Sequence, residues 1–187
     1  MRIYEERSYS LDYKGKTYRI NGTVAAVLAS LGAQEDDVLS DYYKLETALD
    51  ILLPEPHPVE TALLEAVFSV LFPSKKEDAE PCIDFEMDAP LICAAFRQVY
   101  GIDLRKECTT MLWGDFVELL QGLPKNTRFM ERVELRLMEV PKPTQWNAEY
   151  RAKLIAAKAK VQIVKKGESK NKALWNLYRA ISSMAGR

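Results

Sequence analysis

The sequence contains little of the residue chemistry on which catalysis and metal binding usually depend. Its 187 residues include one histidine, His57, between two prolines, and three cysteines, Cys82, Cys93 and Cys108. An odd number of cysteines without a C-x-x-C pair is atypical of a disulfide framework or a structural zinc site. Cys93 has apolar neighbours and is expected to be a small buried residue. We therefore expect no Cys–His catalytic pair and no bound cofactor.

The densest group of carboxylates is Asp84, Glu86 and Asp88. Such a group could bind a divalent cation, or it could interact favourably with the N-terminus of the helix that follows. We favour the interaction with the helix, because no other set of metal ligands accompanies these residues. The sequence thus predicts no catalytic site and no metal site, and a protein that is not an enzyme.

Long apolar runs are also missing. No segment approaches the roughly 20 apolar residues of a membrane-spanning helix, and residues 1–7 lack the apolar stretch of a signal peptide. The composition, with 48% hydrophobic and 28% charged residues, is typical of a globular protein. We expect a cytoplasmic protein without a membrane partner.

The charges are unevenly distributed along the chain. The net charge is −1, but residues 1–144 hold 16 basic and 25 acidic residues, whereas residues 145–187 hold 10 basic and 2 acidic residues. The first part therefore carries −9 and the second +8. A basic tail on an acidic body indicates a role in binding partners.

A β-hairpin is expected near the N-terminus. Residues 9–13 and 17–20 alternate between apolar and polar side chains, and Gly15 lies between them, where a tight turn requires a positive φ. A lone hairpin is marginally stable in water, so this one should pack on helices or join another sheet.

Apolar residues recur at helical spacing through most of the remaining chain. The predicted helices cover 23–33, 41–53, 59–72, 88–100, 110–121, 127–138, 144–164 and 171–184. Pro58 is expected in the first turn of the third helix, and Gly101 after the end of the fourth. The predicted core includes Leu28, Leu49, Phe68, Phe96, Trp113, Phe116 and Val133; Tyr43, Leu137 and Met138 also fall on apolar helix faces. The fold class is thus mainly α, a multi-helix domain with an N-terminal β-hairpin and a long C-terminal helix.

Pro141 and Pro143 divide the chain into a body, 1–140, and a basic C-terminal arm, 144–187. The long helix of the arm has an apolar line that should seek a neighbour or fold back on the body. The candidate partner-binding residues on this line are Tyr150, Leu154, Ala157, Val161 and Val164. We expect the arm to mediate self-association or the docking of a partner.

Three segments, read together, carry a resemblance to a known family. They are the Gly-Lys hairpin ending in Tyr-x-Ile-Asn at Asn21, the segment from Asp-Phe-Glu-x-Asp at 84–88 to Tyr-Gly-Ile-Asp-Leu at 100–104, and the Trp/Phe helix ending in Gly-Leu at 122–123. In order and spacing they resemble the bacteriophage "gene product fifteen" family of long-tailed phages and prophages of Gram-positive bacteria. The resemblance extends over roughly residues 9–140.

This resemblance implies a tail assembly chaperone that binds the tape measure protein in the cytoplasm of the host bacterium. Two other functions stay open. The protein could be a structural tail or adaptor component of the virion. It could also be a nucleic-acid-binding regulator, in which lysines of the arm meet phosphates and Trp175 and Tyr178 stack on bases.

Overall fold

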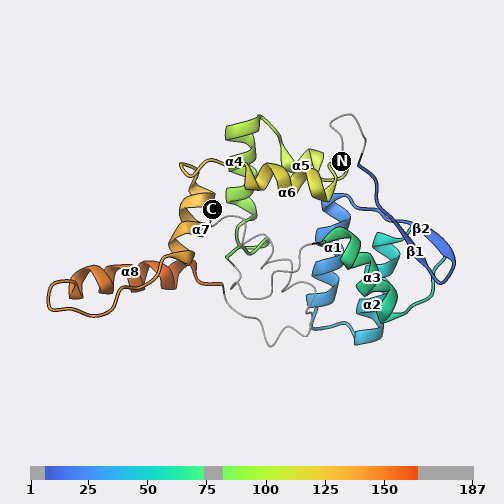
Figure 1. The fold of residues 1–187 in the computed structure, drawn as a ribbon, viewed down its shortest axis with the longest axis horizontal. Helices are drawn as coiled ribbons and strands as arrows, with labels where there is room; N and C mark the ends of the chain where they lie inside the picture. The colour runs from blue at the N-terminus through green and yellow to red at the C-terminus, as the bar shows by residue number, and fades with distance from the viewer. Residues whose placement is uncertain (1–6, 74–81, 164–187) are drawn as a thin grey trace.

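The computed structural model describes residues 7–73 and 82–163, and within these ranges the chain forms a two-stranded sheet and eight helices. Figure 1 shows the hairpin, α2 and α3 on one side of the molecule and α4 and α7 on the other, with α5 and α6 reaching across to the start of α1 and α8 extending outward. The mainly α fold with an N-terminal hairpin is confirmed. The elements are β1 (Ser10–Tyr13), β2 (Lys16–Arg19), α1 (Val24–Glu35), α2 (Asp41–Leu52), α3 (Thr61–Leu71), α4 (Ala89–Tyr100), α5 (Leu104–Glu107), α6 (Trp113–Gln121), α7 (Arg128–Leu137) and α8 (Ala148–Val161).

The predicted hairpin has a two-residue turn. Strands β1 and β2 pair antiparallel, with Leu11 opposite Tyr18, and the turn residues Lys14 and Gly15 have φ values of 50° and 79°. Two consecutive positive φ values match the right-handed twist of the strands, and glycine adopts the second at little cost.

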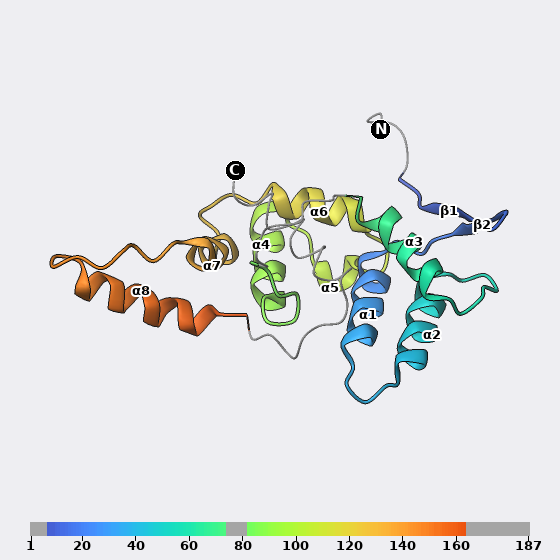
Figure 2. The same cartoon turned by 60° about the horizontal axis from the view of Figure 1, so that its bottom comes forward.

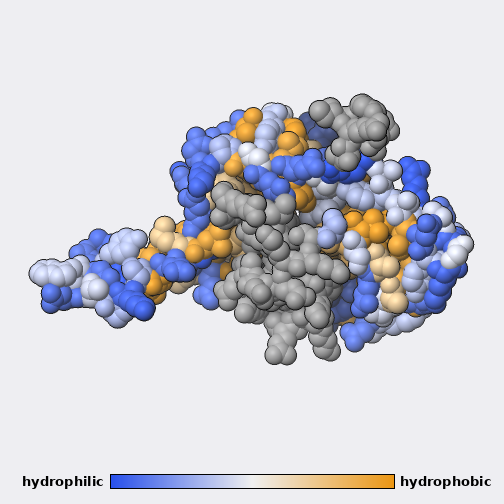
Figure 3. Space-filling view, viewed as in Figure 1, coloured by the Kyte–Doolittle hydropathy of each residue, from blue (hydrophilic) through white to orange (hydrophobic). Residues whose placement is uncertain are grey.

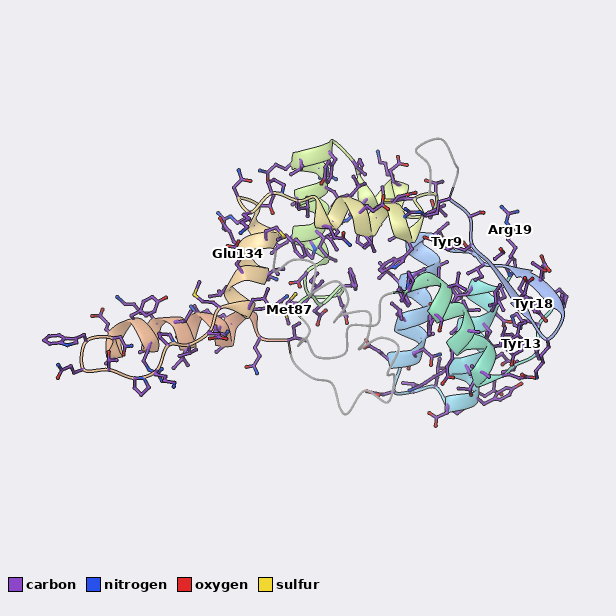
Figure 4. All side chains as sticks on the ribbon, in the orientation of Figure 1. Tyr9, Tyr13, Tyr18, Arg19, Met87 and Glu134 are labelled. Atoms are coloured by element: carbon purple, nitrogen blue, oxygen red, sulfur yellow. The ribbon has the colours of Figure 1, made fainter. Side chains whose placement is uncertain are left out.

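The hairpin is fixed to the segment that precedes α3. The Glu60 carboxylate accepts hydrogen bonds from the Tyr13 hydroxyl at 2.8 Å and from Lys14 Nζ at 2.7 and 2.9 Å, while Lys16 Nζ donates to the Pro56 carbonyl at 2.7 Å. The hydrogen bonds from Lys14 and then Tyr13 lower the pKa of Glu60 below its ordinary value. Figure 4 shows Tyr13 and Tyr18 on the hairpin, at the end of the molecule opposite α8.

Because its pKa is lowered on folding, ionised Glu60 should stabilise the fold above its ordinary pKa, and this contribution should be lost as the pH falls through the folded value. We predict that Glu60→Gln lowers the melting temperature at neutral pH. The difference from the wild type should shrink as the pH falls below the ordinary pKa of a glutamate side chain and the carboxyl becomes protonated. Thermal melts of both proteins over a pH series test this; a difference independent of pH would contradict it.

Tyr9, just before β1, connects the hairpin to α6. Its hydroxyl accepts a hydrogen bond from the Gly114 amide at 2.9 Å, and its ring lies against Gly22, where an added Cβ would be 2.2 Å from Tyr9 Cδ2. Figure 4 shows Tyr9 between the hairpin and the start of α6. The absence of a side chain at Gly22 therefore makes room for the aromatic ring that holds this segment in place.

Two glycine substitutions should consequently have opposite effects. Gly22→Ala should displace the Tyr9 ring and destabilise the fold by about 1–3 kcal/mol, as overpacking does. Gly32→Ala is the matched control, because Gly32 lies in α1 with no atom within 4 Å of an added Cβ. It should stabilise the protein by up to about 1 kcal/mol through helix propensity. Urea titrations measure both, and equal effects would refute the packing role of Gly22.

The start of α1 and the start of α6 are joined by backbone hydrogen bonds. The amides of Val24 and Ala25 donate to the carbonyls of Met111 and Cys108, both at 2.9 Å, and the Trp113 amide donates to the Gly22 carbonyl at 2.8 Å. These long-range bonds hold residues 108–112 outside a helix. They explain why α6 begins at Trp113, although the periodicity predicted a start at residue 110.

The core is built around aromatic side chains. Phe116 stacks on Phe96 with ring centroids 5.4 Å apart, and Trp113 meets Phe72 and Phe85 edge-on at 5.6 and 5.8 Å. These contacts connect α3, α4, α6 and the segment before α4. Of the predicted core residues, Leu49, Phe68, Phe96, Trp113, Phe116 and Val133 are buried, and Leu28 is half-buried against them.

Several predicted boundaries and orientations were wrong. Helix α3 begins at Thr61, and Pro58 lies outside it, because residues 56–60 are held by the hairpin. Helix α5, which has only four residues, was not predicted. Tyr43, Leu137 and Met138 are exposed: the buried residues of α2 lie in its second half, and those of α7 in its first.

The C-terminal helix is shorter than predicted. It covers Ala148–Val161, after Asn147, whose side chain accepts from the Thr144 amide at 2.8 Å and donates to the Lys142 carbonyl at 2.9 Å. These bonds form a turn before the helix, so residues 144–147 are not helical. The predicted helix over 171–184 lies outside the described residues, and the division into body and arm stays a prediction. Among the described residues, no helix is long and apolar enough to cross a membrane.

Candidate interaction surfaces

Helix α8 turns part of the predicted partner-binding line toward the protein's own interior. Leu154 is buried, Ala157 and Val161 are half-buried, and Tyr150 is 55% exposed; Val164 lies outside the described residues. Figure 2 shows α8 running back alongside the segment that follows α7. Of the four described residues of this line, Tyr150 is therefore the exposed one. The partner-binding role of the five residues stays a prediction.

A buried ion cluster connects α7 to the start of α4. The Asp88 side chain is fully buried, and its carboxylate binds Arg132 Nη1 at 3.0 Å and Arg136 through both of its terminal nitrogens, Nη2 at 2.9 Å. Asp88 also accepts from the Asp84 amide at 2.9 Å. A bidentate arginine and a backbone donor satisfy a carboxylate that would otherwise be costly to bury.

Arg136 extends this cluster to the end of α8. Its Nη1 donates to the Cys82 carbonyl at 2.9 Å, and its Nε donates to the Val161 carbonyl at 2.6 Å. In return, Lys158 Nζ donates to the Arg136 carbonyl at 2.8 Å and also to the Met138 carbonyl. One guanidinium thus connects three segments: the stretch before α4, α7 and the last turn of α8. Figure 4 shows Met87 at this junction, where its Sδ lies 3.4 Å from Arg136 Nη2.

The three clustered carboxylates have different roles. Asp84 accepts hydrogen bonds from the amides of Glu86 and Met87 at 2.9 and 2.8 Å, which closes the turn before α4. Asp88 lies immediately before α4, although the predicted helix began at residue 88, and its charge is paired with arginines and not exposed at the helix end. This cluster could not be predicted from the sequence, because Arg132 and Arg136 are more than forty residues from Asp88 along the chain.

Removing the carboxylate should leave buried Arg136 without its counter-charge. We predict that Asp88→Ala lowers the free energy of unfolding by roughly 3–5 kcal/mol, the usual cost of breaking a buried ion pair from one side. Glu134→Ala on α7 is the control, since its ion pair with Lys125 is exposed and 3.9 Å long; it should cost less than about 1 kcal/mol. Urea titration compares them, and similar losses would show that the buried cluster contributes little.

Exposed apolar side chains gather where α7 meets α8 and along α8. Figure 3 shows hydrophobic residues at the junction of body and arm. Leu137 and Met138 lie at the end of α7, the Tyr150 hydroxyl is 3.9 Å from Met138 Sδ, and Ile155 is half exposed. The connection between α7 and α8 forms the far end of the arm (Figure 1) and contains Trp146, which is 88% exposed. Trp146 was not among the residues predicted to bind a partner, although it follows Pro143 by only three residues.

The histidine and the cysteines lie in separate environments. His57 Nε2 is 3.5 Å from Asp50 Oδ1. Cys82 is buried, whereas Cys93, which was expected to be buried, and Cys108 are half-buried. Within residues 7–73 and 82–163, no group of three or more histidine, cysteine, aspartate or glutamate side chains is arranged to hold a metal ion.

A family model described as "Bacteriophage Gp15 protein" matches residues 4–163 of the chain. No curated protein and no solved structure matches. The matched segment includes the hairpin, all eight described helices and the Asp88 cluster.

Proposed function

The chain belongs to the bacteriophage Gp15 protein family, and from that premise we propose that it is a tail assembly chaperone that binds the tape measure protein. The protein would work in the cytoplasm of the host bacterium and leave as the tail tube forms. The observation that carries the proposal is the family match over residues 4–163, together with the tail-assembly role that the sequence resemblance implies.

The physical need for such a protein is clear. A tape measure protein is a long helix-rich chain, and its apolar stripes would aggregate before tube subunits cover them. A helical chaperone can cover an amphipathic segment by presenting apolar side chains of its own. Exposed Leu137, Met138, Tyr150 and Ile155 on α7 and α8 supply such side chains and support a binding role.

Co-expression tests this proposal. The tape measure protein of the same phage should be largely insoluble alone and soluble when the wild-type chain is co-expressed. Tyr150→Ala should reduce the soluble fraction, because it removes the exposed aromatic ring of the predicted line. Lys106→Ala, an exposed change on α5, serves as the control and should leave the soluble fraction unchanged.

Two results would contradict the proposed chaperone function. One is a tape measure protein that stays equally insoluble with and without the wild-type chain. The other is a high copy number of this chain in purified mature virions, measured by quantitative mass spectrometry, which would indicate a structural tail component.

A further inference from the structure

An exposed apolar surface with negative charge lies at the connection between α1 and α2. Val38 is 93% exposed, and the rings of Tyr42 and Tyr43, both more than half exposed, meet edge-on with centroids 5.7 Å apart. We call these three residues, with neighbouring Asp36, Asp37, Asp41 and Glu46, the connector patch.

The connector patch is rich in acidic residues, and their negative charge acts on its aromatic side chains. Residues 35–50 contain six acidic residues and one basic residue, Lys44. The charge of Glu46, whose carboxylate lies 3.3 Å from the Tyr42 hydroxyl, raises the pKa of Tyr42. Large exposed aromatics next to carboxylates favour a partner that is itself apolar and basic.

Helix α8 and the connection before it carry exposed apolar and basic side chains that complement the connector patch. Met138, Trp146 and Tyr150 are exposed, and the spacing of three and four residues places Tyr150, Lys153 and Lys160 along one side of α8. We call these five residues the arm patch. Residues 138–163 carry five basic and two acidic residues, and one of the acidic residues, Glu149, pairs with Lys153 at 2.6 Å.

The two patches cannot meet within one molecule. In the views of Figures 1 and 2, the arm extends away from the body on one side, and the connection between α1 and α2 lies on the other. Arg136 fixes the end of α8 to α7 through the Val161 carbonyl, so the described arm points outward. The arm patch can therefore reach a connector patch only on a second copy of the chain.

We infer that this protein associates with itself head to tail, with the arm patch of one copy docked on the connector patch of the next. Trp146 and Tyr150 pack against Val38, Tyr42 and Tyr43, and the arm lysines face the acidic residues around them. Because the two surfaces differ, the contact is heterologous and extends into a ring or an open chain. The inference does not depend on tape measure binding, since both patches belong to this chain.

Sedimentation equilibrium of the full chain tests the association. The wild type should form oligomers as its concentration rises, and high salt should weaken them by screening the charges. An arm variant, Trp146→Ala with Tyr150→Ala, and a connector variant, Tyr42→Ala with Tyr43→Ala, should each raise the dissociation constant at least about tenfold. Lys106→Ala is the control and should associate like the wild type. All four substituted aromatics are exposed, and circular dichroism checks that the variants fold.

Mixing the two variants is the decisive step. The arm variant keeps its connector patch and the connector variant keeps its arm patch, so the mixture should form a one-to-one complex that grows no further. A wild type that stays monomeric at every concentration would overturn the inference. So would a mixture that stays monomeric, or a connector variant that still dimerises, since the latter result would indicate a symmetric contact between two arms.

Discussion

The buried carboxylate of Asp88 is the constraint on which the arrangement of the second half of the chain depends. A charge at this position has to be compensated where it lies, because the cost of removing it from water is several kcal/mol. Arg132 and Arg136 supply that compensation from one face of α7, which fixes the rotation of α7 against the start of α4. Arg136 then binds the Val161 carbonyl and so determines where α8 ends. Lys158 adds hydrogen bonds from α8 back to the carbonyls of Arg136 and Met138, so these two side chains together hold α8 in its direction.

Local signals in the sequence predicted much of the fold. Gly15, between two segments of alternating apolar and polar residues, predicted the hairpin. Gly101 predicted the end of α4, where it adopts a left-handed backbone conformation with a φ of 71°. The aromatic residues Phe96, Trp113 and Phe116 were identified as core, because large rings at helical spacing are usually buried. In each case the information lies within a few residues of the feature.

Features that depend on distant partners could not be predicted in this way. The start of α6 is set by a hydrogen bond from Trp113 to Gly22, about ninety residues earlier. Asp88 looked like an exposed helix-terminal carboxylate, and only the fold brings Arg136 to it. The candidate line on α8 was predicted from periodicity alone, which cannot tell whether Leu154 faces the protein's own body or a partner. The structure buries Leu154 and leaves Tyr150 and Trp146 exposed.

The most direct test of the account is amide hydrogen exchange in the full wild-type chain and in Asp88→Asn. If the cluster holds α7 and α8 in place, the variant should lose protection mainly in the last turns of α7 and in α8. Helices α1 to α3, which lie on the other side of the core, should lose less, by the fall in global stability alone. Unchanged protection in α8, or an equal loss in all helices, would contradict the claim that Asp88 positions the arm.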